Sequence, residues 1–212
     1  MNIATITHLI KKDLNVFKVY YISISVLMLI VSMLVVVANT NMLRIFAGSG
    51  SSIAIIAIYT FMLERKNGSA WFHIASLPVT RIEINTARFL TVLLISVVNL
   101  IIWIIAYHSI LYFVIESTEH TASIAIIVYA FMNILIYLAL YFIFYYRVNN
   151  IVIMMVYIIP VLAINFIDPS DSSFAEFIIG DSYRFGLFCG FSILLFTGAY
   201  LYSNYYFKNK EL

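Results

Sequence analysis

The sequence predicts an all-α integral membrane fold in a single domain, residues 1–212, with six transmembrane helices. The chain has 212 residues, of which 64% are hydrophobic and only 10% are charged, whereas soluble domains are about half apolar and about a quarter charged. Six stretches without Asp, Glu, Lys or Arg are each long enough for a helix to cross a bilayer, where a helix satisfies its own backbone. They are residues 19–38, 45–63, 89–115, 122–146, 148–167 and 185–207. This composition excludes a soluble enzyme, a nucleic-acid-binding protein and a disordered chain.

The distribution of basic residues predicts the orientation of the spans. An even number of spans places both termini on one side of the membrane. Ten of the 12 lysine and arginine residues then lie on that side, and only Arg44 and Arg184 lie on the other. Cytoplasmic loops carry an excess of Lys and Arg, so we expect both termini in the cytoplasm.

Residues 3–17 have the pattern of an amphipathic helix. Apolar side chains recur on one helical stripe, and the polar residues between them lie largely on the other face. The stripe consists of Ile3, Ile6, Ile10, Leu14 and Phe17. We therefore expect a helix that lies on the cytoplasmic surface of the membrane; an ordinary soluble flank is the alternative.

The loop of residues 64–80, between the second and third spans, contains several local structure signals. An Asn-Gly turn precedes Ser69, which can cap a short helix. This helix carries Trp71 and Phe72 and ends before Pro78, because a residue that precedes proline avoids the helical conformation. We expect a rigid cytoplasmic loop with exposed aromatic side chains, which is a suitable place to receive force from a partner.

The start of the third membrane helix is also encoded locally. Thr80 and Glu83 have the spacing of a capping box, in which each side chain satisfies a free backbone amide of the other residue. Val79 and Ile84 occupy the two positions of a hydrophobic staple. These four residues predict a helix that starts immediately after Thr80.

The loop of residues 168–184, between the fifth and sixth spans, is acidic but includes the sequence Phe-Ala-Glu-Phe-Ile-Ile. Ser172 or Ser173 can cap a short helix there. The sequence leaves three arrangements open: a helix on the outer surface, a helix that dips into the membrane, and a plain acidic loop.

The sequence has no motif for catalysis, nucleotide binding or metal binding. It lacks the P-loop, the His-Glu-x-x-His helix and the Gly-x-Ser-x-Gly turn, and its four histidines are too dispersed for a metal set. No charged residue lies within the six stretches, although ion-driven pumps usually keep such groups despite a cost of about 3 kcal/mol each. We therefore expect no catalytic, cofactor-binding or metal site in this chain, and an external source of energy for any transport.

Neutral polar residues within the spans are candidates for the wall of a cargo pathway. They follow one face of the fourth span at intervals of four residues and recur in the third span. The candidates are Tyr129, Asn133, Tyr137 and Tyr141 in the fourth span, and Ser96 and Asn99 in the third. Their rings and polar groups suit an amphipathic cargo; the alternative is packing between helices, with polar side chains bonded across them.

The loop before the third span resembles a known family. Type-2 ABC exporter permeases are similar to this chain in the segments Glu64-Arg65-Lys66-Asn67-Gly68, Ser76-Leu77-Pro78-Val79-Thr80-Arg81 and Arg88-Phe89-Leu90. The six-span plan and the amino-terminal surface helix are similar over the whole length. The resemblance implies that two permeases pair, as a homodimer or a heterodimer, in a bacterial cell membrane. It also implies that two cytoplasmic ATPases, which hold ATP and Mg²⁺, dock beneath them.

The same resemblance implies roles for the loop. The short helix before Pro78 corresponds to the coupling helix, which inserts into a groove on the ATPase, and Trp71 and Phe72 are the candidates to fill that groove. The residues implied to contact the ATPase are Glu64, Arg65, Lys66, Trp71, Phe72, Leu77, Pro78 and Arg81. The amino-terminal stripe corresponds to the connecting helix of the family.

The expected cargo is an amphipathic peptide or a lipid-like molecule that leaves the cell. The nearly charge-free spans and the short outer loops depart from the family pattern and disfavour polysaccharide or other large hydrophilic cargo. Two alternatives stay open. A substrate-binding membrane module of a vitamin importer also has six spans, but the Ala-x-x-x-Ala face of such modules is missing from the first span here. A membrane protease is disfavoured because its motifs are missing.

Overall fold

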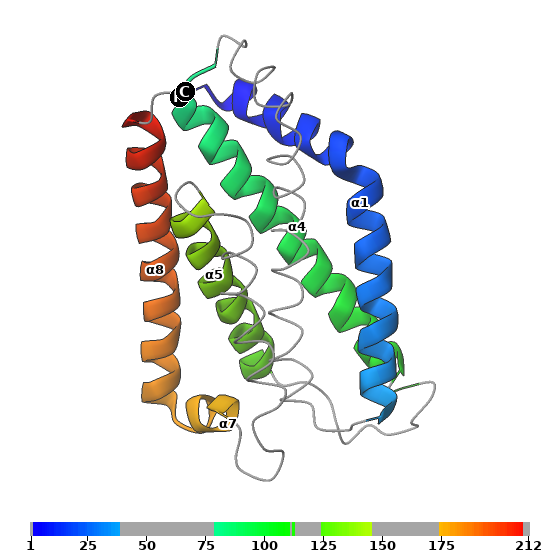
Figure 1. Ribbon diagram of the computed structural model, residues 1–212. Helices are drawn as coiled ribbons and strands as arrows, with labels where there is room; N and C mark the ends of the chain where they lie inside the picture. The colour runs from blue at the N-terminus through cyan, green and yellow to red at the C-terminus, as the bar shows by residue number, and fades with distance from the viewer. Residues whose placement is uncertain (1, 39–78, 111, 113–123, 146–173, 210–212) are drawn as a thin grey trace.

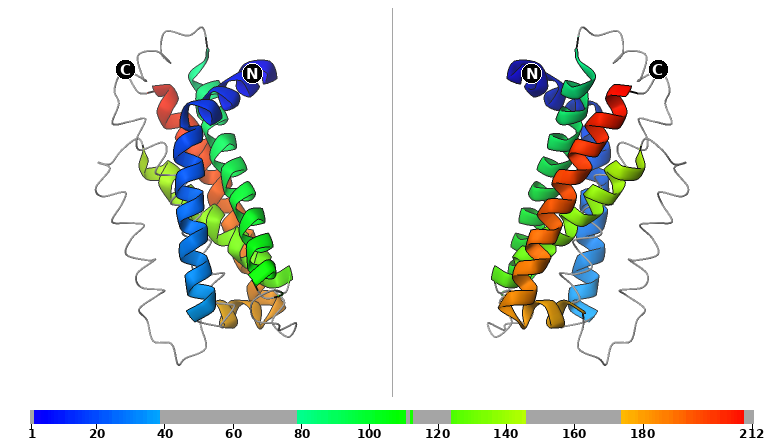
Figure 2. Two further views of the ribbon diagram at one scale, coloured as in Figure 1. Left: turned by 90° about the vertical axis from the view of Figure 1, so that its right-hand side faces the viewer. Right: turned by 90° about the vertical axis from the view of Figure 1, so that its left-hand side faces the viewer.

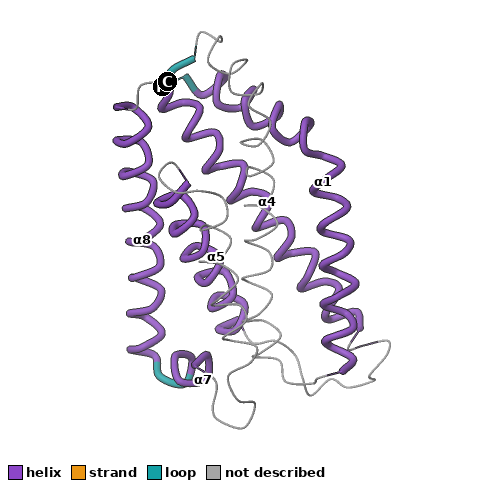
Figure 3. Tube along the Cα trace, in the orientation of Figure 1, coloured by secondary structure: helices purple, strands orange, loops and turns teal. Residues whose placement is uncertain are grey.

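The computed structural model describes residues 2–38, 79–110, 112, 124–145 and 174–209. The helices within them are α1 (Ile3–Ala38), α4 (Arg81–Ile110), α5 (Ile124–Tyr145), α7 (Phe174–Ile179) and α8 (Ser182–Asn209). Figure 3 shows no strand among the described residues, and those outside helices form short loops. The all-α fold class is therefore confirmed for this part of the chain.

Three of the described helices are long and apolar enough to cross a membrane. The segments are Arg81–Ser109, Ile124–Phe144 and Ser182–Tyr206. They correspond to the predicted third, fourth and sixth spans and indicate a membrane protein. The predicted first span lies within α1, whereas the second and fifth spans lie outside the described residues. The total of six spans therefore stays a prediction.

Helix α4 begins at Arg81, as the local signals predict. The Thr80 backbone amide donates to Glu83 Oε2 at 3.1 Å, and the Glu83 amide donates to Thr80 Oγ1 at 3.3 Å, so the capping box is confirmed. Val79 packs against the core cluster that includes Ile84, which is the neighbourhood that a hydrophobic staple requires. Capping and staple together set the angle at which the chain enters the helix.

Two charged residues lie in the first turns of α4. Glu83 and Arg88 precede the apolar stretch that is predicted as the third span, which begins at residue 89. In the structure they are only 7% and 2% exposed. Asp13 of α1 is also buried, and the Lys12 ammonium lies 3.8 Å from its carboxylate. Buried charges are tolerated when they are paired, so polar contacts continue inside this end of the bundle.

Helix α1 runs from Ile3 to Ala38. Figures 1 and 2 show that its first turns are inclined to the remainder, which lies along α4. In the predicted apolar stripe Ile6 is buried and Ile10 and Leu14 pack against the core, whereas Ile3 is exposed. The stripe therefore faces the protein as well as its surroundings, and its position on a membrane surface stays a prediction.

The main core is built around α4, which contacts α1, α5 and α8. Phe89 of α4 stacks on Phe142 of α5 with 3.5 Å between ring centroids. It meets Phe196 and Tyr200 of α8 edge-on, at 5.7 and 5.1 Å. Aromatic pairs in these geometries add to the stabilisation that burial provides. One ring thus joins α4 to α5 and α8.

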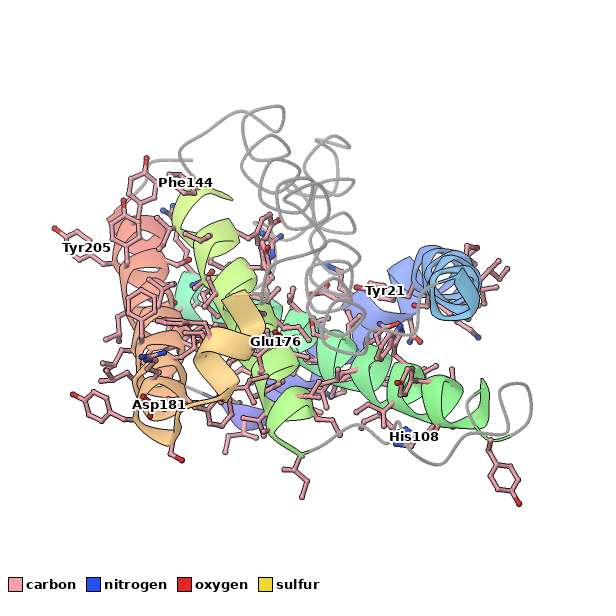
Figure 4. The ribbon with its side chains drawn as sticks, turned by 90° about the horizontal axis from the view of Figure 1, so that it is seen from below. Tyr21, His108, Phe144, Glu176, Asp181 and Tyr205 are labelled. Carbon is pink, nitrogen blue, oxygen red and sulfur yellow. The ribbon has the colours of Figure 1, made fainter. Side chains whose placement is uncertain are left out.

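Helix α7 is the short helix predicted in the loop of residues 168–184. It packs against α5 and α8, close to the start of α8 (Figure 4). Gly180 lies at the turn between α7 and α8, and a side chain is disfavoured there because an added Cβ would lie 2.9 Å from the Glu176 carbonyl oxygen. A short helix, which the sequence left open beside a plain loop, is therefore present, while Ser172 and Ser173, its candidate caps, lie outside the described residues.

Candidate functional site

Helices α1 and α4 begin at a shared carboxylate. Glu83 Oε2 accepts from the Thr80 amide at 3.1 Å and from the Thr80 hydroxyl at 2.9 Å, and Oε1 accepts from the Asn2 amide at 2.6 Å. Asn2 in turn caps α1, since its Oδ1 accepts from the Ala4 amide at 3.0 Å. Negative charge is stabilising near helix N-termini, and an ionised acceptor makes the stronger kind of hydrogen bond. Glu83 therefore joins the amino ends of two helices.

The next turn of α4 is bonded to the carboxyl end of α8. Asn85 Nδ2 donates to Asn204 Oδ1 at 2.7 Å, and Ser203 Oγ donates to Asn85 Oδ1 at 3.1 Å. The hydroxyl oxygens of Thr86 and Tyr200 lie 2.9 Å apart. These pairs are separated by 114 to 119 positions in the chain, so tertiary packing brings them together.

We refer to these two sets of residues together as the polar junction. It consists of Asn2, Thr80, Glu83, Asn85, Thr86, Tyr200, Ser203 and Asn204. The groups are hydrogen-bonded within each set. The Glu83 carboxylate has three donors, and Asn85 has partners for both ends of its amide. Such bonds fix the relative positions of helices, because a polar group that loses its partner away from water is costly. The chemistry of the junction suits mechanical linkage.

The polar junction follows directly on the loop that the resemblance assigns to the ATPase. Seven of the assigned residues lie outside the described residues: Glu64, Arg65, Lys66, Trp71, Phe72, Leu77 and Pro78. Arg81 is described, as the first residue of α4, and is partly exposed. The chain therefore passes from the predicted coupling loop into the junction within a few residues.

The polar row predicted along the fourth span lies mostly inside the protein. Tyr129, Tyr137 and Tyr141 of α5 are 4%, 6% and 0% exposed. Tyr129 stacks on Phe188 of α8 at 5.1 Å, and Asn133 donates to the Tyr129 carbonyl oxygen of its own helix at 3.1 Å. Buried side chains that contact a neighbouring helix are typical of packing between helices. A role of this row in a cargo pathway stays a prediction.

The two candidates from the third span also point inward or back onto their own helix. Asn99 Nδ2 donates to the Ile95 carbonyl oxygen, one turn earlier, at 2.9 Å. Ser96 has no exposed surface, and within the part of the chain that the structure describes its hydroxyl makes no hydrogen bond. Neither side chain is bonded to α5 among these residues.

Sequence reasoning missed the residues that cross between helices. Asn85, Ser203 and Asn204 fall near the ends of apolar stretches, where polar residues are expected to meet water. The useful signal was the capping box, because it places Asn85 inside the first turns of a helix. Its partner 119 positions away has no local signature. For metal ions, no group of three or more His, Cys, Asp or Glu in the described ranges is arranged to bind one.

The chain matches a known protein family over nearly its whole length. The family model described as ABC-2 family transporter protein covers residues 8–208. No curated protein and no solved structure matches the chain. The match confirms the resemblance at the level of type-2 ABC permeases, which are membrane components that work in the lipid bilayer with ABC ATPase subunits. The chain therefore belongs to the ABC-2 transporter family, as a membrane permease subunit of an ABC transporter.

Proposed function

We propose that this permease exports an amphipathic peptide or a lipid-like cargo from the cell, driven by a separate ATPase. The observation that carries the proposal is the polar junction, which joins the starts of α1 and α4 and the end of α8 immediately after the predicted coupling loop. A displacement of the loop reaches three helices together. A loop that served only as a connection would not need these bonds.

The energy for this transport is supplied by the partner subunit. The chain has no P-loop, and ABC-2 permeases work with ABC ATPases. In this proposal Trp71 and Phe72 fill a groove on the ATPase, since large aromatic side chains dominate the energy of many interfaces. ATP and Mg²⁺ are bound by that subunit, and a second permease, identical or homologous, completes the transporter.

The proposal for the cargo rests on the amino-acid composition of the predicted spans. Aromatic rings and neutral polar groups are frequent in them, while charges are missing from the six apolar stretches. Taken as a whole, the sequence also resembles a membrane subunit of the phenol-soluble modulin exporter, a peptide-toxin efflux system of Gram-positive bacteria. An amphipathic helical peptide is therefore the first cargo to test, in a bacterial cell membrane with both termini of the chain in the cytoplasm.

The test uses inverted membrane vesicles that contain the chain together with its co-purifying ATPase. A fluorescent amphipathic helical peptide should accumulate inside the vesicles when ATP is added, because export from a cell is import into an inverted vesicle. A peptide of the same composition with a scrambled, non-amphipathic sequence should not accumulate. Accumulation without ATP, or accumulation only in right-side-out vesicles that are loaded with ATP, would contradict the proposal.

A double variant tests the coupling loop separately. Trp71→Ala with Phe72→Ala should abolish both ATP-dependent accumulation and co-purification with the ATPase, while membrane insertion is retained. The matched control is Leu194→Ala, since Leu194 is 73% exposed on α8 and lies in another segment of the chain. Unchanged co-purification of the double variant would remove these two residues from the ATPase contact.

A further inference from the structure

A groove lies between α4 and α8, next to the polar junction. Its volume is about 260 Å³, and its lining residues are Thr86, Phe89, Leu90, Leu93, Phe196 and Tyr200. On α4, Thr86, Leu90 and Leu93 are three or four positions apart and Phe89 is adjacent to Leu90, while the two residues on α8 are four positions apart, so each set occupies one side of its helix. Apart from two hydroxyl groups, the walls consist of aromatic rings and leucine side chains.

The two hydroxyl groups have no proton to offer to an occupant. The Thr86 hydroxyl has a single hydrogen, and it donates to the Ile82 carbonyl oxygen at 2.7 Å. The 2.9 Å contact between Thr86 Oγ1 and the Tyr200 hydroxyl is then a bond in which Tyr200 donates. A phosphate, a carboxylate or a peptide carbonyl therefore finds no free hydroxyl donor in the groove, and an apolar occupant is favoured.

The groove opens onto an exposed apolar surface. Leu90 at its rim is 42% exposed, Leu94 on the following turn of α4 is 46% exposed, and Ile193 of α8 is 50% exposed. Of an 18-residue apolar stretch in each helix, only 11% is buried in α8, against 56% in α5. Figure 4 shows Tyr205 of α8 pointing away from the other helices. An acyl chain can therefore move from the bilayer into the groove without leaving apolar surroundings.

We infer that this groove binds one acyl chain of a bilayer phospholipid. Its volume of about 260 Å³ is below the roughly 300–1,000 Å³ typical of pockets for drug-sized ligands, so it suits a segment of a flexible chain. An acyl chain that packs against Phe89 supplies the dispersion contacts that an empty groove would lack. The lipid then adds an apolar link between α4 and α8 beside the hydrogen bonds of the polar junction. This inference depends on membrane insertion alone, so it is independent of the proposed cargo and direction of transport.

The test uses the full-length chain in nanodiscs that contain a phospholipid with a photoreactive diazirine in one acyl chain. After irradiation, peptide mass mapping locates the labelled residues. We expect residues 86–93 and 196–200 to be labelled severalfold more than Leu187, which is exposed on α8 but does not line the groove. Equal labelling would mean that the groove is only part of the general lipid surface, and would overturn the inference.

Two matched variants test whether the groove itself is occupied. Leu93→Trp fills the groove and should remove the excess labelling. Leu94→Trp adds the same side chain at the neighbouring exposed position and should leave the labelling unchanged. Undiminished labelling in Leu93→Trp, or a cross-link between the groove and a second copy of the chain in place of lipid, would contradict an acyl-chain site.

A fluorescence measurement covers the case in which Leu93→Trp does not fold. Leu90→Trp places a tryptophan at the partly exposed rim, and the signal of the wild-type protein is subtracted. Bilayers with increasing fractions of phospholipid brominated in the acyl chain should quench this tryptophan to saturation at a low fraction, because a bound chain exchanges for a brominated one. Quenching in simple proportion to the brominated fraction, as expected for Leu94→Trp, would overturn the inference.

Discussion

The two halves of α4 use the same type of side chain in different ways. In the amino-terminal half, Asn85 donates to Asn204 of α8 at 2.7 Å. In the carboxyl-terminal half, Asn99 donates to the Ile95 carbonyl oxygen of its own helix at 2.9 Å. One asparagine thus joins two helices, while the other is satisfied within a single helix.

Two hydroxyl residues of α4, Thr86 and Ser109, repeat this difference. Thr86 is bonded to Tyr200 of α8, with 2.9 Å between the oxygens. Ser109, near the other end of the helix, donates to the Ile105 carbonyl oxygen at 2.8 Å. The contrast therefore does not depend on the chemistry of asparagine.

The difference indicates where α4 is held and where it is free to adjust. Any polar side chain within a bilayer needs a partner, and a carbonyl of the same helix is sufficient. A bond to another helix also limits the relative movement of the two helices. Among the described residues, the amino-terminal half is therefore held by directional bonds to α8, and the other half contributes buried aromatic residues such as Trp103 and Tyr107 to the core. In the proposed transporter, displacement of the coupling loop would enter α4 at the firmly held end.

Asn85→Leu should lower the free energy of unfolding more than the other substitutions in α4. The substitution removes two bonds to α8 and leaves the polar groups of Ser203 and Asn204 without these partners. Hydrogen bonds between membrane helices contribute about 0.6 kcal/mol on average and up to about 1.7 kcal/mol, so we expect the free energy of unfolding to fall by about 1–2 kcal/mol. Reversible unfolding in bicelles measures this change. Asn99→Leu is the matched control and should change stability little; an equal loss for both variants would contradict the comparison.

Glu83→Ala should loosen the starts of two helices together. The carboxylate accepts from Asn2 and from Thr80, so its removal should accelerate amide hydrogen exchange in both residues 2–6 and residues 80–84. Thr80→Ala is the control, because it removes only the cap of α4 and should accelerate exchange only in residues 80–84. Unchanged exchange in residues 2–6 of Glu83→Ala would show that Glu83 does not hold α1.

Thr86→Val tests the hydrogen bond between Thr86 and Tyr200 with a smaller and nearly isosteric change. A double-mutant cycle with Tyr200→Phe should give a coupling free energy of about 0.6 kcal/mol, the average for a bond between membrane helices. Ser109→Ala should have little effect on the free energy of unfolding, since its bond stays within one helix. A coupling of zero between Thr86 and Tyr200 would remove this bond from the polar junction.

Ser96→Ala should have the smallest effect and the opposite sign. Ser96 lies between the two halves, is fully buried, and makes no hydrogen bond with the described residues. Removal of a buried hydroxyl without such a bond should leave the melting temperature unchanged or raise it slightly. A clear fall in the melting temperature would show that the hydroxyl has a structural partner.

Local signals predicted a large part of the described fold. The capping box of Thr80 and Glu83 could be predicted because its partners are three positions apart, so a single turn of helix brings them together. The three helices that are long and apolar enough to cross a membrane followed from apolar length, because a bilayer requires about 20 apolar residues in a helix. The short helix before Gly180 was indicated by an apolar segment within an acidic loop.

The candidate site could be predicted only in its local part. The sequence indicated the loop and the start of α4, but the bond from Asn2 to Glu83 joins residues 81 positions apart. Likewise, the stripe of α1 was expected to face a membrane surface, and the structure buries Ile6 against the core. Periodicity indicates which residues share a face, while the neighbour that covers the face depends on how the helices pack.

By itself the sequence determined that the chain is helical, that it crosses a membrane, and that α4 starts at Arg81. These properties follow from contacts within a few residues or with lipid. Only the tertiary structure decided which polar groups bond across helices and which return to their own helix. Asn85 and Asn99 are the same residue in the same helix, and they differ in whether α8 brings a polar group within reach.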